Sequence, residues 1–221
     1  MDSIDTSSVT AFHTFEPMSK GIDIEGFSRF LDQIRQGVTT DLHGFIEANA
    51  QIVEKLSAEG AMLSNGRESI QWDDATLIFV AAREVEKDGG PARALDQGIS
   101  IERLGRFPSE DGNPIGYLRR YLLDESPEKL GERLLAQLDV GLRSEIRGDD
   151  FLSNGFGGMS LHGWLTDSDV TNLRSFLQQA KWKVAKDEVF DGGVREIVRH
   201  LSIMLKAAEK RGVGIIMRSH T

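Results

Sequence analysis

The last thirty residues constrain the fold most, because they join a long amphipathic helix to a strand that must be buried. Apolar side chains recur at helical spacing at Val194, Ile197, Val198, Leu201, Leu205 and Ala208. Lys210 and Arg211 bring positive charge to the last turn, and Gly212 follows where a left-handed cap residue is needed. Residues 213–217, Val-Gly-Ile-Ile-Met, are rich in β-formers and predict a buried strand. This ending predicts a helix and a strand that both pack on the rest of the chain.

Two helices are predicted in the first sixty residues. Asp23 is placed to cap a helix that runs to about Gln36. Thr39 or Thr40 is expected to cap the next helix, which ends near Gly60. Both assignments depend on short oxygen-bearing side chains, which accept hydrogen bonds from the free backbone N–H groups of a first helical turn.

The apolar run at residues 75–82 allows two interpretations. Asp73 and Asp74 precede it as capping residues and favour a helix, which would stop at the glycine pair 89–90. A strand through residues 76–80 remains open, because a short apolar run has no distinguishing period.

The middle of the chain is predicted to be helical with one loop. Pro91 suits a first helical turn and begins a short helix that ends at Gly98. Residues 99–113 have a mixed, loop-like composition, residues 114–123 predict a helix, and residues 126–142 predict another.

The motif Thr166-x-x-Asp169 resembles a capping box, with Asp in place of the usual Glu. Leu165 and Val170 are placed to form the hydrophobic staple that accompanies such a start. The helix that begins here is expected to extend to about Trp182.

The predicted fold class is α+β, mainly α-helical with a small β-sheet that includes the C-terminal strand. Residues 1–20 are expected to be a flexible lead-in with a possible edge strand at 10–15. Residues 21–148 form a mainly helical acidic part, and residues 149–160 a glycine-rich connector. Residues 161–221 form a helix-helix-strand part, which is expected to pack with the rest as one globular unit.

Negative charge is concentrated in the first half of the chain. Residues 1–100 have 17 acidic and 8 basic side chains, a balance of −9, whereas residues 101–150 carry −3 and residues 151–221 carry +3. Such a surface repels nucleic acid and anionic lipids and favours a protein partner with a basic surface. The alternative is that acidic faces serve solubility alone.

Motifs for catalysis or cofactor binding are absent from the sequence. There is no cysteine, which excludes disulfides, thiolate nucleophiles and Cys-based zinc sites. The five histidines show no metal-binding spacing; they are His13, His43, His162, His200 and His220. The glycines of residues 155–160 match no phosphate loop, and Ser160 with His162 lacks the nucleophile-elbow pattern. We therefore expect no metal and no cofactor.

The cellular setting expected from the sequence is the cytoplasm, without a membrane role. The longest apolar run, residues 75–82, is too short to span a bilayer. The first residues contain no basic segment followed by an apolar core, so no signal peptide is expected.

The first functional hypothesis is a non-enzymatic protein-binding or inhibitory factor that acts by stoichiometric contact. An immunity or antitoxin-like factor of bacterial or phage conflict would fit the acidic half and the missing catalytic motifs. The contact residues predicted from charge and expected exposure are Asp41, Glu47, Glu54, Asp73 and Asp74.

Two other classes remain open at this stage. A hydrolytic enzyme could have an active site without a known motif around Asp73, Asp74 and His162. A structural subunit of a larger assembly, or a homo-oligomer, is the other alternative. The balance of these observations favours binding over catalysis.

Overall fold

A computed structural model describes residues 11–38, 41–108, 112–142, 158–179 and 181–220 of the 221-residue chain. It is α+β and mainly helical, with a small antiparallel sheet that includes the C-terminal strand, so the predicted fold class is confirmed. In chain order the elements are β1 (Phe12–Met18), α1 (Ile24–Arg35), α2 (Leu42–Ala48), α3 (Ala50–Ala58), the 3₁₀ turns η1 (Leu63–Asn65) and η2 (Arg67–Ser69), α4 (Asp74–Ala82), α5 (Ile99–Gly105), α6 (Pro114–Tyr121), β2 (Leu122–Asp124), α7 (Leu130–Val140), β3 (Met159–Leu165), α9 (Asp167–Gln179), β4 (Trp182–Val184), α10 (Gly193–Arg211) and β5 (Gly214–His220).

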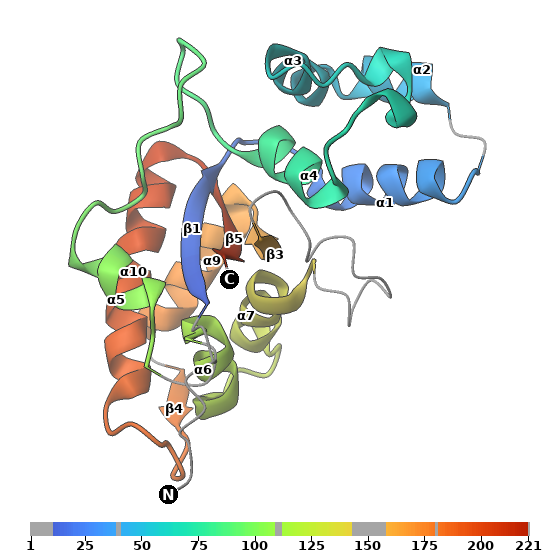
Figure 1. The fold of residues 1–221 in the computed structure, drawn as a ribbon. Helices are drawn as coiled ribbons and strands as arrows, with labels where there is room; N and C mark the ends of the chain where they lie inside the picture. Colours follow the sequence, from blue (N-terminus) through green and yellow to red (C-terminus); the bar gives the residue numbers. More distant parts are fainter. Residues whose placement is uncertain (1–10, 39–40, 109–111, 143–157, 180, 221) are drawn as a thin grey trace, which may run out of the picture.

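The central sheet has the strand order β1-β5-β3, with both pairs antiparallel (Figure 1). The C-terminal strand therefore lies in the middle, and Ile215, Ile216 and Met217 are fully buried. Ile215 and Met217 belong to the core formed with α6, α7, α9 and α10, whereas Ile216 belongs to the core formed with α1 and α4. Successive side chains of a strand point to opposite faces, so β5 joins the two cores.

The end of α10 has the cap that the sequence predicts. Gly212 adopts a left-handed conformation with φ of 66°. Its N–H donates to the Glu209 carbonyl, and the Val213 N–H donates to the Ala208 carbonyl, both at 3.1 Å. This pair of bonds is the Schellman pattern, which closes a helix where glycine supplies positive φ.

Helices α1 to α4 form a helical lobe, residues 22–82, which stands beside the sheet (Figure 1). Its interior includes Phe27, Leu56 and Ile78, each almost without exposed surface. Residues 76–80 lie in α4, which decides the open choice between helix and strand in favour of helix. The lobe is tied to the sheet where Ser19 N–H donates to the Ala82 carbonyl at 2.9 Å.

The predicted second helix differs from the structure at both ends of α2. Asp41, not a threonine, caps α2, because its carboxylate accepts from the Gly44 N–H at 2.9 Å. Residues 39–40, where the cap was expected, lie outside the described part of the chain. Asn49, with φ of −124° and ψ of 43°, then leaves helical geometry and separates α2 from α3.

The short helix predicted from Pro91 to Gly98 is wrong. Pro91 instead forms a β-bridge with Val85 across the turn at residues 86–90. The helix of this region is α5, which begins at Ile99 within a stretch that was expected to be a loop. It forms there because Leu104 becomes buried against the core that includes α10.

The segments expected to be flexible are partly ordered. Residues 12–18, inside the expected lead-in, form the edge strand β1, and residues 1–10 lie outside the described part. Most of the expected connector at 149–160 also lies outside it, and Met159 already belongs to β3. The helix expected to reach Trp182 ends at Gln179, and Trp182 begins β4, which pairs with β2.

Thr166→Ala is expected to lower the free energy of unfolding by about 0.5–2 kcal/mol. The Thr166 hydroxyl accepts from the Asp169 N–H at 3.1 Å, and the Asp169 carboxylate accepts from the Thr166 N–H at 3.2 Å. Urea unfolding followed by circular dichroism measures the loss. Thr171→Ala, on the exposed side of the same helix, is the control and should change stability by less than about 0.5 kcal/mol. Equal effects of the two substitutions would contradict the capping role.

Candidate functional site

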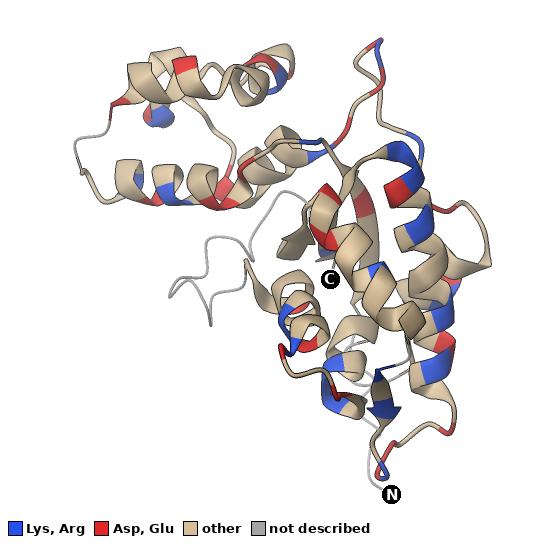
Figure 2. Cartoon of the chain, turned by 180° about the vertical axis from the view of Figure 1, so that it is seen from behind, with Lys and Arg blue, Asp and Glu red and all other residues tan. Residues whose placement is uncertain are grey.

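The helical lobe has a strongly acidic surface. Residues 22–82 contain ten acidic and four basic side chains, a balance of −6. The exposed acids are Asp23, Glu25, Asp41, Glu47, Glu54, Glu59 and Glu68. Among the basic residues of the lobe, Arg29 is exposed and pairs with Glu25 at 3.3 Å, whereas the other three are partly buried. In Figure 2 the ribbon of these helices is coloured red at the acidic residues, and blue stretches are fewer there.

Three of the five predicted contact residues lie on this surface. Asp41 caps α2, and its side chain is otherwise exposed. Glu47 lies in the last turn of α2 and pairs with His43 at 3.2 Å, where both side chains are largely exposed. Glu54 is exposed on α3. These three acids are available to a partner.

The other two predicted residues are engaged within the fold. Asp73 is partly buried and caps α4, where it accepts from the Thr76 N–H at 2.7 Å. Asp74 is 4% exposed, and its carboxylate accepts from Arg35 Nη2 at 2.6 Å and from Arg67 Nη2 at 2.7 Å. The exposure expected for Asp74 is therefore wrong, because two arginines enclose it.

The hydrolytic alternative built on Asp73, Asp74 and His162 gains no support from these positions. The two aspartates are committed to a helix cap and to an ion-pair network. His162 is buried on β3, where Nδ1 lies 3.3 Å from the Asp139 carbonyl and Nε2 lies 2.8 Å from Ser219 Oγ. A carbonyl oxygen accepts, so Nδ1 donates and Ser219 donates to Nε2. Ser219 is 4% exposed, and this pair therefore links β3, β5 and α7 inside the protein.

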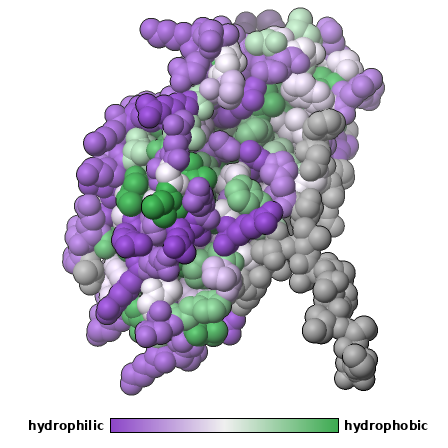
Figure 3. Space-filling view, turned by 60° about the vertical axis from the view of Figure 1, so that its left-hand side comes forward, coloured by the Kyte–Doolittle hydropathy of each residue, from purple (hydrophilic) through white to green (hydrophobic). Residues whose placement is uncertain are grey.

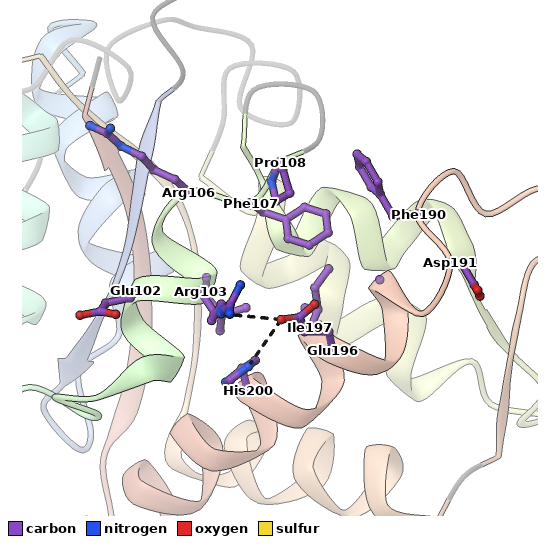
Figure 4. Close-up of a pocket in the computed structure, with 12 residues that line it drawn as sticks. Glu102, Arg103, Arg106, Phe107, Pro108, Phe190, Asp191, Glu196, Ile197 and His200 are labelled. Carbon is purple, nitrogen blue, oxygen red and sulfur yellow. Dashed lines mark ion pairs between the residues drawn. The ribbon is translucent and has the colours of Figure 1, made fainter.

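A pocket of about 290 Å³ lies between α5, α10 and the segments 106–108 and 190–193 (Figure 4). Phe107 and Phe190 form one side, with ring centroids 6.0 Å apart and planes nearly perpendicular. Glu196 lies on the other side, 3.8 Å from Arg103. Over the face shown in Figure 3, hydrophobic residues lie among hydrophilic ones. The most exposed apolar residues of the two helices are Ile99 of α5 and Ile203 of α10.

His200, which lines this pocket, forms a buried pair with Ser100, but the pair is not catalytic. His200 Nε2 lies 3.2 Å from Arg199 Nη2, and a guanidinium can only donate, so Nε2 accepts. Nδ1 then carries the proton and donates to Ser100 Oγ at 3.0 Å. Burial, together with the charge of Arg199, lowers the pKa of His200 and keeps the ring neutral. A donor cannot take the serine proton, so Ser100 is not activated.

A second pocket lies where the helical lobe meets β1, and sequence reasoning missed its central residues. It has a volume of about 500 Å³, and Ser19, Lys55 and Arg83 line it together with Glu54. Lys55 Nζ lies 2.5 Å from Ser19 Oγ. A weak signal was present in the sequence, since Lys55 stands between Ile52 and Leu56 on the apolar face of α3.

The described residues contain neither a group of His, Cys, Asp and Glu side chains able to hold a metal ion nor a helix long and apolar enough to cross a membrane. The expected absence of a metal or cofactor stays a prediction.

No family model, no curated protein and no solved structure matches this chain. The features of this chain that bear on function are the two pockets and the acidic surface of the helical lobe.

Proposed function

We propose that this chain is a protein-binding or inhibitory factor that acts by stoichiometric contact, with the acidic surface of the helical lobe facing a basic partner. The observation that supports it is the imbalance of exposed charge in residues 22–82, where seven exposed acids stand against the exposed base Arg29. Helix caps at Asp23 and Asp41 fix the starts of α1 and α2. The acids are thus presented on ordered helices at low entropic cost.

An acidic surface of this kind acts chiefly on the rate of association. Complementary charges steer the encounter of two proteins, and added salt screens them because the Debye length is about 10 Å at 0.1 M. An immunity or antitoxin-like inhibitor of a basic protein would use such steering to capture its target quickly. The absence of cysteine fits the cytoplasmic setting that belongs to this proposal.

The structure allows a sharper choice of residues for the test than the sequence did. Asp41 and Asp73 cap helices and Asp74 is buried, so their replacement would disturb the fold. Glu47, Glu54 and Glu68 are exposed, lie on separate elements of the lobe, and cap none of its helices.

The triple variant Glu47→Lys, Glu54→Lys and Glu68→Lys is expected to slow association with the partner several-fold while the fold stays intact. The partner is first captured from the native cell with the wild-type chain and identified by mass spectrometry. Surface plasmon resonance at about 0.05 M and 0.3 M salt then gives the association rates, and the wild-type rate should fall as salt rises.

A matched control makes the same change in charge elsewhere. Glu128, Glu132 and Asp187 are exposed acids outside the lobe, and their triple reversal to Lys should leave the association rate near that of the wild type. If salt and both triple variants leave the rate unchanged, the acidic lobe is a solubility feature and the proposal fails.

A further inference from the structure

We propose that Ser19 and Lys55 form a nucleophile and general-base pair for acyl transfer, in the pocket between the helical lobe and β1. This inference goes beyond the proposed binding function and does not depend on it. Among the residues described above, three serines lie within hydrogen-bond distance of a histidine or lysine side chain. In two of these pairs, Ser100–His200 and Ser219–His162, the serine is almost fully buried. The Ser19–Lys55 pair differs because both side chains are partly exposed and line a pocket.

Lys55 Nζ donates to three acceptors, as an ammonium group does, and two of the three are backbone carbonyls. Nζ lies 2.8 Å from the Arg83 carbonyl, 3.2 Å from the Ala81 carbonyl and 2.5 Å from Ser19 Oγ. A neutral amine has two N–H groups and one lone pair. When the ammonium group loses one proton, the two carbonyls, which can only accept, hold the two remaining N–H groups, and the lone pair that is left faces Ser19 Oγ. This is the arrangement in which a lysine removes a proton from a serine, as in Ser–Lys variants of the catalytic triad.

The electrostatics of the site make the neutral amine accessible near neutral pH. Burial lowers the pKa of Lys55 to about 8; the Arg83 charge acts in the same direction and Glu84 opposes it. About half of the Lys55 side chains are then neutral at pH 8, compared with a small fraction for an ordinary lysine. In the ammonium form the third N–H donates to Ser19 Oγ, and the Ser19 hydroxyl can donate to the Arg83 carbonyl at 3.2 Å.

The pocket indicates the class of substrate. Its volume is about 500 Å³, and its wall mixes polar and apolar groups, with Gln51, Glu54 and Glu59 from α3 and its C-terminal end and Glu86 and Lys87 from the segment after α4. Acidic and basic groups are mixed, so the wall does not select one sign of charge. These properties fit a small, water-soluble acyl ester or amide better than a lipid.

The reaction balances with water as the second substrate. Lys55 takes the Ser19 hydroxyl proton as Oγ forms a bond to the acyl carbon. The Lys55 ammonium then returns that proton to the leaving alcohol or amine as its bond to the acyl carbon breaks. In the second half, Lys55 removes a proton from water, which attacks the acyl-Ser19 ester, and Ser19 recovers its proton from Lys55. No oxidant, reductant or metal ion is needed.

The test is labelling of the full-length chain by a fluorophosphonate, in which Ser19 Oγ bonds to phosphorus, fluoride leaves and Lys55 takes the proton. Intact-mass and peptide mass spectrometry should place the adduct on Ser19, and Ser19→Ala should remove it. In the wild-type chain the labelling rate should rise about tenfold per pH unit below the pKa of Lys55 and level off above about pH 8. Labelling at other serines, no labelling, or a rate without this pH profile would overturn the proposal.

The variant Lys55→Arg distinguishes a general-base role of residue 55 from a purely structural role as a cation at the end of α4. Arginine keeps the positive charge and the donors near the C-terminal end of α4, but it stays protonated and cannot act as a base. We expect labelling of Ser19 at pH 8 to fall about 100-fold, within the range for general-base catalysis. Lys206→Arg, an exposed site on α10, is the matched control and should label at the wild-type rate.

Thermal unfolding monitored by circular dichroism shows whether each variant is folded. If Lys55→Arg does not fold, the wild-type pH profile and the mapped adduct still decide the question. If it folds and labels Ser19 as fast as the wild type, Lys55 is only a helix-end contact. The hydrolysis of p-nitrophenyl acetate, followed at 400 nm, then extends a positive result to turnover, and Ser19→Ala should reduce it to the background rate.

Discussion

Leu201→Ala is expected to lower the free energy of unfolding by about 2–5 kcal/mol. Leu201 lies on the buried side of α10 with no exposed surface, and its core includes Leu165, Leu205 and Ile215. The truncation removes three carbon atoms from the closely packed core. A cavity remains because the surrounding helices and the sheet can relax only partly into the empty space. Urea unfolding monitored by circular dichroism measures the change, and the m-value should stay that of the wild type.

Ile203→Ala is the matched control on the same helix. Ile203 is 47% exposed, so its truncation removes much less buried surface and should cost less than about 1 kcal/mol. If Leu201→Ala also costs less than about 1 kcal/mol, α10 does not pack as described, and the C-terminal segment cannot be the centre of the fold.

The parts of the fold that could be predicted from the sequence are those fixed by neighbouring residues. The helix that ends at Gly212 depends on a local apolar period and a local cap, and both are visible in the sequence. Thr166 and Asp169 are three residues apart and satisfy each other's backbone donors. Such elements need no distant partner to be recognised.

The parts that could not be predicted depend on residues far away in the chain. A possible edge strand at residues 10–15 is predicted from the sequence, but the full extent of β1, Phe12–Met18, depends on its pairing with β5, about 200 residues later. Helix α5 becomes stable through its contact with α10, although its own residues are mixed in character. Pro91 has a good local signal for a helix start, but the bridge to Val85 determines its conformation. Tertiary contact overrides propensity in each of these cases.

The candidate sites show the same division. The acidic character of the lobe follows from composition, and Glu47 and Glu54 are exposed as expected. The Ser19–Lys55 pair joins residues that are 36 positions apart in the sequence. Lys55 also donates to the carbonyl of Arg83 at the end of α4, which is also distant in the chain. The sequence of a single chain gives no means of pairing Ser19 with Lys55.

Asp74→Ala is expected to cost about 3 kcal/mol, at the low end of the range for breaking a buried ion pair. The Asp74 carboxylate accepts from Arg35 once and from Arg67 twice, at 2.6 to 3.1 Å. Arg35 keeps a second partner in Asp32 at 2.7 Å, and both arginines retain some contact with solvent. These two features place the loss below the upper limit of that range.

Asp73→Ala is the comparison that makes this prediction specific. Asp73 is the neighbouring acid and caps α4 through the Thr76 N–H, so its loss should cost about 0.5–2 kcal/mol. Arg67 also donates to the carbonyls of Ile70 and Trp72, so Asp74→Ala should loosen the segment before α4 as well as destabilise the chain. Hydrogen exchange of residues 67–76 and urea unfolding measure the two effects. If Asp74→Ala lowers the free energy of unfolding no more than Asp73→Ala does, the two arginines do not enclose Asp74. Asp74 would then again be a candidate for contact with a partner.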